Sequence, residues 1–175
     1  MNSYEKIVDE INTVEYSADI KSIVNLINTS KTIFALGNGR SGLISKAFAN
    51  RLLHLGFNVH SIGEITCPKV KPNDLVIVFS KTLNNENIIN HIKQSIKCNA
   101  KVLIITSDGY KKACEYADEV IHVNCPNTSQ PMGTLFEQSS LMISDSLVID
   151  IMNHKKYDNS VLSKNHANIE WYKTH

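Results

Sequence analysis

The segment LGNGRSG at residues 36–42 contains the residues whose types and spacing point most directly to ligand chemistry. Its glycines at positions 37, 39 and 42 match the G-x-G-x-x-G pattern, which lets a backbone turn sharply and approach a phosphate closely. Arg40 and Ser41 lie inside the pattern and add a guanidinium group and a hydroxyl donor. An apolar run precedes the segment and an amphipathic stretch follows it, so we expect a strand to end and a helix to begin here. Because helix N-termini attract anions, the segment predicts a site for a phosphorylated, hydroxyl-rich ligand.

Two other interpretations of this segment remain open from the residues alone. A dinucleotide would need an acid about 20 residues further on to bind its ribose, and Glu64 lies near that distance. No part of the chain, however, has the character of a separate catalytic domain for a nicotinamide enzyme. The glycines can also serve only to pack a helix closely against a strand.

The composition of the 175-residue chain is that of an ordinary globular protein, with 42% hydrophobic and 20% charged residues. Lys and Arg number 18 against 17 Asp and Glu, and they form no basic cluster, so we expect no nucleic-acid partner. The apolar runs are shorter than the roughly 18 residues that span a bilayer, so we expect no membrane partner. The first residues, MNSYEKIVDEI, lack the order of a signal peptide, and we expect a cytoplasmic protein.

Short apolar runs alternate with helical patterns from about residue 31 onward. Predicted strands occupy residues 32–36, 57–62, 75–79, 102–106 and 119–123. Predicted helices occupy residues 43–55, 85–98, 110–117 and 134–154, with an N-terminal helical segment over about 3–28, a break near Ser17, and a C-terminal helical tail over about 158–170. Such alternation predicts one α/β domain over residues 1–175, a three-layer α/β/α sandwich of flavodoxin-like or Rossmann-like type with a five-stranded parallel sheet.

Ligands of such sheets bind at the carboxyl ends of the strands, close to the point where the strand order reverses. This rule directs attention to the loops at residues 37–42, 63–68, 80–85, 106–110 and 124–133. Cysteines occur at positions 67, 98, 114 and 125 without a C-x-x-C pair, so we expect neither a metal site nor a disulfide framework.

Four segments, in the same order along the chain, resemble the 6-phospho-3-hexuloisomerases, a family of sugar-isomerase (SIS) domain proteins. They are FALGNGRSGLISKAFANRLLHLG at 34–56, GEITCP at 63–68, PMGTLFE at 131–137 and HANIE at 166–170. The resemblance implies an α/β sandwich, a homo-oligomer that is usually a tetramer, and neither cofactor nor metal. It also implies the interconversion of 3-hexulose 6-phosphate and fructose 6-phosphate, a step of the ribulose monophosphate pathway.

The resemblance implies Glu137 as the base that moves a proton through a cis-enediol, with His166 as a second catalytic residue. In the family the C-terminal segment packs close to a neighbouring subunit's site. The predicted substrate-binding residues are Asn38, Gly39, Arg40, Ser41, Ser80, Lys81, Thr82, Asn85, Met132 and Gly133. Simpler roles stay open: an acid in a first helical turn favours the helix dipole, and a histidine near a chain end is commonly only exposed.

The loop at residues 80–85 departs from the family pattern S-G-S-G-x-T, because Lys81, Leu83 and Asn85 replace its two glycines and its threonine. A leucine adopts glycine-like backbone angles only at a cost of roughly 1–2 kcal/mol, so we expect a changed loop geometry. Lys81 either supplies a charge for the phosphate or is a solvated surface lysine. This departure keeps open a non-catalytic or altered-specificity SIS module; a nicotinamide-dependent oxidoreductase fragment is the weakest alternative.

Roles for Arg51 and His54 are not decided by the sequence, since Arg51 suits either an ion pair or the site and His54 lies on an apolar helix face. The N-terminal helix and the helix at 134–154 carry more apolar residues than one packed face requires. This excess favours subunit contacts, although deep burial within one chain would also explain it.

Overall fold

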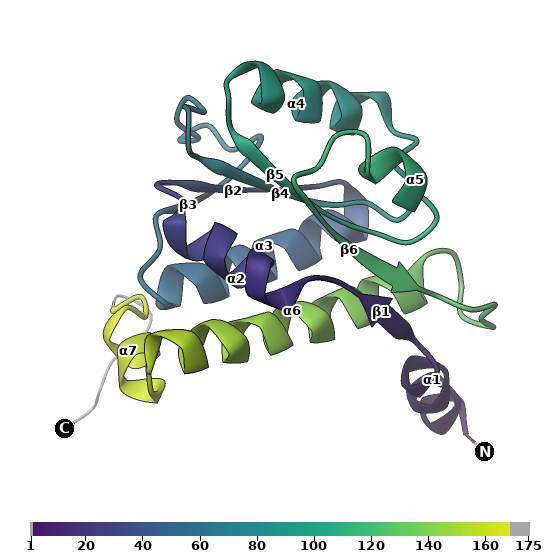
Figure 1. The fold of residues 1–175 in the computed structure, drawn as a ribbon. Helices are drawn as coiled ribbons and strands as arrows, with labels where there is room; N and C mark the ends of the chain where they lie inside the picture. The colour runs from purple at the N-terminus through teal and green to yellow at the C-terminus, as the bar shows by residue number, and fades with distance from the viewer. Residues whose placement is uncertain (1, 169–175) are drawn as a thin grey trace.

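The structure is a computed structural model that describes residues 2–168, and it shows a twisted sheet between two layers of helices (Figure 1). The elements, in chain order, are α1 (Ser3–Asn12), β1 (Glu15–Ser17), α2 (Ile20–Thr29), β2 (Ile33–Gly37), α3 (Gly39–His54), β3 (Val59–Ser61), β4 (Leu75–Phe79), α4 (Glu86–Lys97), β5 (Lys101–Thr106), α5 (Tyr110–Ala113), β6 (Glu119–Asn124), α6 (Thr134–Lys155) and α7 (Asn159–Lys164). The α/β class and the layered sandwich predicted from the sequence are confirmed. The last two positions of the predicted C-terminal tail, 169 and 170, lie outside the described residues.

The sheet has the strand order β1-β6-β5-β4-β2-β3, and β2 to β6 run parallel. Its central strand β4 is buried along its whole length, which explains why Leu75–Phe79 reads as a continuous apolar run. Residues alternate between the two faces of this strand, with Ile77 facing one core and Val76 and Val78 facing the other.

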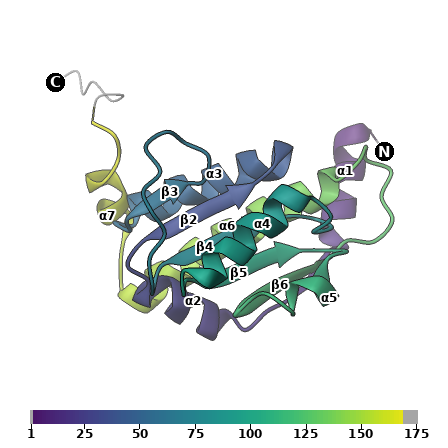
Figure 2. The same cartoon turned by 90° about the horizontal axis from the view of Figure 1, so that it is seen from above.

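The two helical layers fill these two cores. α2, α3 and α6 cover one face of the sheet, while α4 and α5 cover the other, as Figures 1 and 2 show from two directions. On the first face Phe48 of α3 meets Phe79 of β4 edge to face, with ring centroids 6.2 Å apart. On the second face Ile88 and Ile92 of α4 are buried against the sheet. None of the described helices combines the length and apolar character needed to cross a membrane.

The structure corrects the predicted five-stranded parallel sheet, because it contains a sixth strand, β1, which lies at the break predicted near Ser17 in the N-terminal helical segment. β1 pairs antiparallel with β6, placing Glu15 opposite Asn124 and Ser17 opposite His122. Its three residues are all exposed, so the sequence shows no alternation of apolar and polar residues that would predict a strand here. The strand forms because β6 offers an open edge, a partner more than 100 residues away that local pattern does not reveal.

Candidate active site

The candidate site lies where the strand order of the sheet reverses. β2 pairs with β3 on one side and with β4 on the other. The chain therefore continues toward one edge of the sheet after β2 and toward the opposite edge after β4. In open α/β sheets a crevice forms at this point, outside the carboxyl ends of the strands. The loop after β2 and the loop after β4 are therefore neighbours.

The glycine-rich loop brings β2 and α3 into direct backbone contact. A Cβ atom on Gly42 would lie 2.7 Å from the Gly37 carbonyl oxygen, so both positions exclude a side chain. Gly39 has a φ of 55°, which favours glycine, and it begins α3. Within the described residues the Asn38 side chain makes no capping hydrogen bond to α3. The first amides of this helix are thus available to an anion.

The loop at residues 80–85 keeps a glycine-like turn without glycine. Leu83 has a φ of 52°, and its side chain is fully buried in the core beneath α4. The Ser80 hydroxyl accepts a hydrogen bond from the Leu83 amide at 3.2 Å, and the Lys112 ammonium donates to the Leu83 carbonyl at 2.8 Å. Burial and these two bonds hold leucine in the left-handed conformation.

Exchanging Leu83 for glycine is expected to lower the free energy of unfolding by about 2 kcal/mol. The change relieves roughly 1–2 kcal/mol of backbone strain but removes a buried leucine, which costs about 2–5 kcal/mol. Urea denaturation measures the difference. Asn73→Gly is the matched control, because Asn73 also has a positive φ, 68°, but is exposed. A Leu83→Gly variant more stable than the wild type would contradict this account of the loop.

Lys81 faces a pocket of about 330 Å³ between the loop after β4 and the segment that links β6 to α6. Its ammonium forms an ion pair with Asp108, in the loop after β5. The Lys81 carbonyl accepts hydrogen bonds from the amides of Ser107, at 3.1 Å, and Gly109, at 3.2 Å. Backbone contacts between the two loops therefore fix the lysine at the pocket wall.

Three more residues, Cys125, Met132 and Gly133, line this pocket. Burial raises the pKa of the Cys125 thiol, against smaller lowering effects of Ser107 and Lys81, so Cys125 lines the pocket as a neutral thiol. Met132 and Gly133 line it as well, and Met132 is 97% exposed with a φ of 56°. The lining thus offers one cation, one carboxylate and an exposed methionine side chain to a small polar ligand.

Glu137 follows the pocket-lining residues Leu135 and Phe136 in the first turn of α6 and forms an ion pair with Arg40. The side chain of Glu137 is only 13% exposed, whereas that of Arg40 is 64% exposed. A Cβ atom on Gly133 would lie 3.4 Å from Lys81 Cδ and 4.0 Å from Glu137 Oε1. The structure therefore brings together Arg40 from the start of α3, Lys81 from the loop after β4, and Gly133 and Glu137 from the start of α6.

His166 lies away from this group of residues, next to the C-terminal end of α3. Its ring stacks on that of His54, with centroids 4.7 Å apart, and Asn165 Nδ2 donates to the His54 carbonyl at 3.0 Å. These residues line another pocket, of about 540 Å³, with His60 and Glu64. Arg40 and His54 are separated by most of α3, about 21 Å at 1.5 Å per residue. Within one chain, His166 and Glu137 are not brought together.

Several other residues singled out in the sequence have contacts of their own. Asn85 caps α4, and its side-chain oxygen accepts from the Asn87 and Ile88 amides at 3.0 and 3.2 Å. Ser41 and Thr82 are half-buried at the two loops that face each other. Arg51 lies 4.0 Å from Asp145 of α6, an ion pair on the helix surface. Glu64 pairs with Lys46 at 3.2 Å, so its nearest charge is a lysine of α3.

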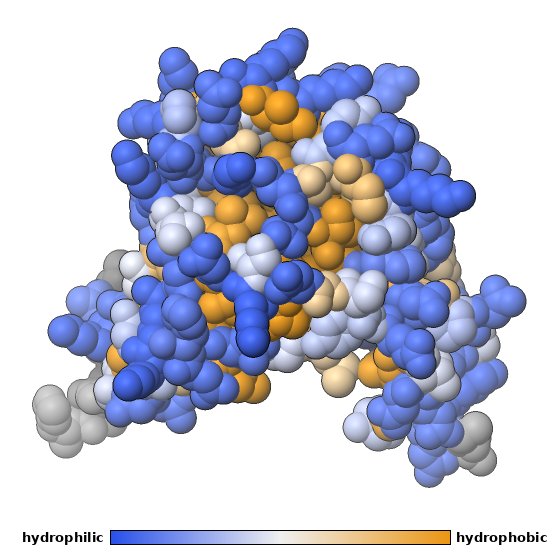
Figure 3. Space-filling view, viewed as in Figure 1, coloured by the Kyte–Doolittle hydropathy of each residue, from blue (hydrophilic) through white to orange (hydrophobic). Residues whose placement is uncertain are grey.

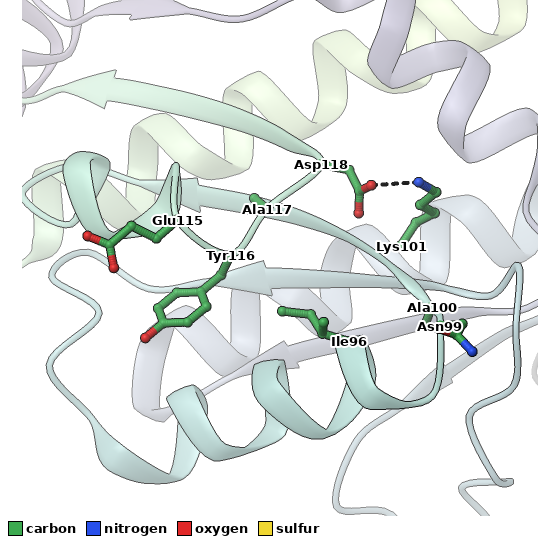
Figure 4. A pocket seen from close by; sticks show the side chains of 8 residues that line it. All are labelled: Ile96, Asn99, Ala100, Lys101, Glu115, Tyr116, Ala117 and Asp118. Carbon is green, nitrogen blue, oxygen red and sulfur yellow. Dashed lines mark hydrogen bonds and ion pairs between the residues drawn. The ribbon is translucent and has the colours of Figure 1, made fainter.

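A further pocket, of about 360 Å³, opens at the opposite edge of the sheet, between the end of α4 and the start of β5 (Figure 4). Its charged groups already satisfy each other, since Lys101 Nζ lies 2.7 Å from Asp118 Oδ1. The other oxygen of Asp118 accepts from the Val102 amide at 2.8 Å. These contacts tie β5 to the turn before β6, so this pocket has a structural explanation.

Sequence reasoning missed Asp108 and the pocket wall formed by Asn127, Thr128 and Gln130. Both lie in loops that follow strands, at 106–110 and 124–133, and the sequence predicts that ligands bind at such loops. Only the positions of the loops carried a signal. The individual residue types, an aspartate and small polar residues, are common in any loop.

The chain is similar to a known domain family and to individual proteins of that family. The profile of the SIS domain family matches residues 26–149. A 3-hexulose-6-phosphate isomerase of Bacillus subtilis (strain 168) is 31% identical, over 97% of this chain and 100% of its own length. One from Methylomonas aminofaciens is 30% identical, over 97% of this chain and 100% of its own.

Among solved structures, a Methanococcus jannaschii protein whose crystal structure was taken to infer the function of a 3-hexulose-6-phosphate isomerase has a TM-score of 0.82. It is 28% identical, and the alignment covers 97% of this chain and 99% of that protein. The family profile covers the strands and loops that build the candidate site, from α2 to most of α6. The resemblance detected in the sequence is confirmed, and the chain belongs to the SIS domain family.

Proposed function

We propose that this protein is a sugar-phosphate isomerase that interconverts 3-hexulose 6-phosphate and fructose 6-phosphate. The observation that carries the proposal is the half-buried Glu137 carboxylate, held by Arg40 beside a pocket with a cationic wall at Lys81. Full-length relatives at about one-third identity that bear the name of this isomerase support the choice of substrate. The family and the site geometry thus lead to the same reaction class.

The chemistry needs a base on one face of an extended sugar chain. Glu137 removes the proton from the hydroxyl-bearing C2 of the 3-ketose, and the electron pair forms the C2–C3 double bond of a cis-enediol. Return of the proton to C3, with transfer of the hydroxyl proton from O2 to O3, completes the exchange and leaves the carbonyl at C2. Arg40 orients the carboxylate, since its guanidinium donates to Glu137 Oε2.

The phosphate is proposed to bind between the two loops at the strand-order reversal. The first turn of α3 offers amides from the glycine loop, and the loop after β4 adds the hydroxyl of Thr82 and the ammonium of Lys81. Ser80 contributes indirectly, because its hydroxyl supports the turn at Leu83. Asn85 also acts through structure in this proposal, since its side chain caps α4.

His166 enters the proposal as a residue supplied by a second copy of the chain. Within one chain it stacks on His54 at the far end of α3, away from Glu137. Shared sites of this kind require a homo-oligomer, which we propose together with a cytoplasmic role in the ribulose monophosphate pathway. The assembly would place the α7 end of one copy over the candidate site of another.

The test is turnover of 3-hexulose 6-phosphate by the purified chain, followed as release of fructose 6-phosphate. Exchange of substrate hydrogen with solvent deuterium at C2 would identify the enediol route. Binding of fructose 6-phosphate by calorimetry without turnover would instead favour a non-catalytic SIS module. Absence of both binding and turnover would overturn the substrate assignment.

A further inference from the structure

The segment between β6 and α6, residues 125–133, forms one wall of the candidate pocket and has no regular secondary structure. Asn127, Thr128 and Gln130 of this segment line the pocket together with Lys81 and Asp108. A loop of this length needs contacts elsewhere to keep one shape, because each ordered residue loses conformational entropy. The shape of the pocket therefore depends on what holds the segment.

Glu10, on α1, is the residue that holds it. Glu10 Oε1 accepts from the Ser129 amide at 2.9 Å and from the Ser129 hydroxyl at 2.7 Å. Glu10 Oε2 accepts from the Thr128 hydroxyl at 2.5 Å and from Gln130 Nε2 at 3.0 Å. Together the two carboxylate oxygens thus accept four hydrogen bonds from three consecutive residues of the pocket segment.

The topology explains why residues so distant in sequence meet. β1 pairs antiparallel with β6, so the start of β1 at Glu15 lies opposite the end of β6 at Asn124. α1 comes before Glu15 and the pocket segment follows Asn124, which places both at the same end of this strand pair. Figures 1 and 3 show α1 projecting from the body of the molecule at this end.

The four donors also set the charge state of the carboxylate. Hydrogen bonds from the Thr128 hydroxyl first, and then from the Ser129 hydroxyl and amide, lower the pKa of Glu10 to about 2. At neutral pH the group is therefore an ionised acceptor, able to receive all four bonds at once. A neutral acid or an amide at this position would offer fewer acceptor sites.

We propose that Glu10 is a positioning residue for the candidate active site, which fastens residues 128–130 so that the pocket wall is formed before the sugar phosphate arrives. The inference rests on the proposed function for its kinetic consequence, but not for its structural one. Without the carboxylate, the segment samples other conformations and the substrate must order it on binding. The apparent affinity for the substrate then equals the intrinsic affinity multiplied by the fraction of chains whose pocket is formed.

The kinetic test compares Glu10→Ala with Asp9→Ala, a change of the same charge at an exposed neighbour on α1. Glu10→Ala is expected to raise KM about tenfold and to leave kcat within roughly twofold of the wild type. Asp9→Ala is expected to change neither constant. Ser129→Ala, which removes one of the four donors, is expected to raise KM in the same direction but less. An unchanged KM in Glu10→Ala overturns the proposal.

Amide hydrogen exchange without ligand separates this proposal from the proposed function. In Glu10→Ala, peptides covering residues 125–133 are expected to exchange faster, while β4 keeps its protection and shows that the chain is folded. Unchanged exchange across residues 125–133 would overturn the proposal even if KM rises. If the wild type turns over no 3-hexulose 6-phosphate, the proposed function fails, and exchange still decides the role of Glu10.

Discussion

Replacing Glu137 by glutamine is expected to lower kcat for 3-hexulose 6-phosphate by about 10²- to 10⁴-fold, with little change in KM. Glutamine keeps the shape of the side chain and an acceptor for Arg40, but its amide does not accept a proton from carbon. The loss therefore falls on the chemical step rather than on binding. Steady-state kinetics measure both constants, and deuterium exchange at C2 should fall in parallel.

The matched control for this variant is Glu86→Gln. Glu86 also lies in the first turn of a helix, α4, but it is exposed. If Glu137 served only the helix dipole, both variants would lose a few tenths of a kcal/mol of stability and keep their activity. Equal turnover of Glu137→Gln and the wild type would remove Glu137 from the mechanism.

The same variant tests whether His166 is shared between copies. Glu137→Gln and His166→Ala are each expected to be impaired when assembled alone. Assemblies refolded from a mixture of the two chains are expected to regain part of the wild-type activity, because some sites receive an intact Glu137 and an intact His166 from different copies. A mixture no more active than its components would contradict delivery of His166 by a second copy.

Replacing Lys81 by methionine is expected to weaken binding of fructose 6-phosphate roughly 10- to 100-fold. A charge-assisted hydrogen bond to phosphate contributes about 1.5–3 kcal/mol, and 1.4 kcal/mol corresponds to a factor of ten. Methionine retains the apolar stem, so packing against Gly133 is preserved. Calorimetric titration gives the dissociation constant. Lys111→Met, an exposed lysine on α5, controls for a general loss of positive charge.

Asp108 supplies the second half of this test. Because Asp108 pairs with Lys81, an arriving phosphate has to compete with a carboxylate for the same ammonium. Asp108→Asn is therefore expected to tighten binding several-fold, and to lose this benefit in the Lys81→Met background. Additive effects of the two changes would show that Asp108 does not weaken binding by competing for Lys81.

Much of the fold followed from the pattern of apolar residues. The predicted strand at 75–79 coincides with β4, since a strand buried on both faces must be apolar throughout. The predicted helix at 134–154 matches α6 to within one residue at its C-terminal end, Lys155. The strand β1 was not predicted, because its three residues are all exposed and show no alternation of apolar and polar side chains. Only its pairing with the distant strand β6 defines it.

The loops that form the candidate site could be predicted from the sequence, but the hydrogen bonds between their residues could not. The glycines of residues 36–42 have geometric consequences that any sequence containing them must satisfy. By contrast, Leu83 adopts a glycine-like angle because its side chain is buried and its backbone is bonded to Ser80 and Lys112, none of which the loop sequence alone reveals. The contacts of Glu10 likewise depend on register across the β1–β6 pair.

Both margins of the sheet are formed by very short strands, β1 and β3, each of three residues. An edge strand of three residues offers few backbone groups with which a strand of another molecule can pair. Aggregation by strand addition, a common route to fibrils, is therefore disfavoured in this protein. Exposed apolar side chains occur instead on α6, where Met142 and Ile149 are 57% and 59% exposed and lie seven positions apart on one stripe. Self-association of the chain is therefore expected to use helical faces rather than sheet edges.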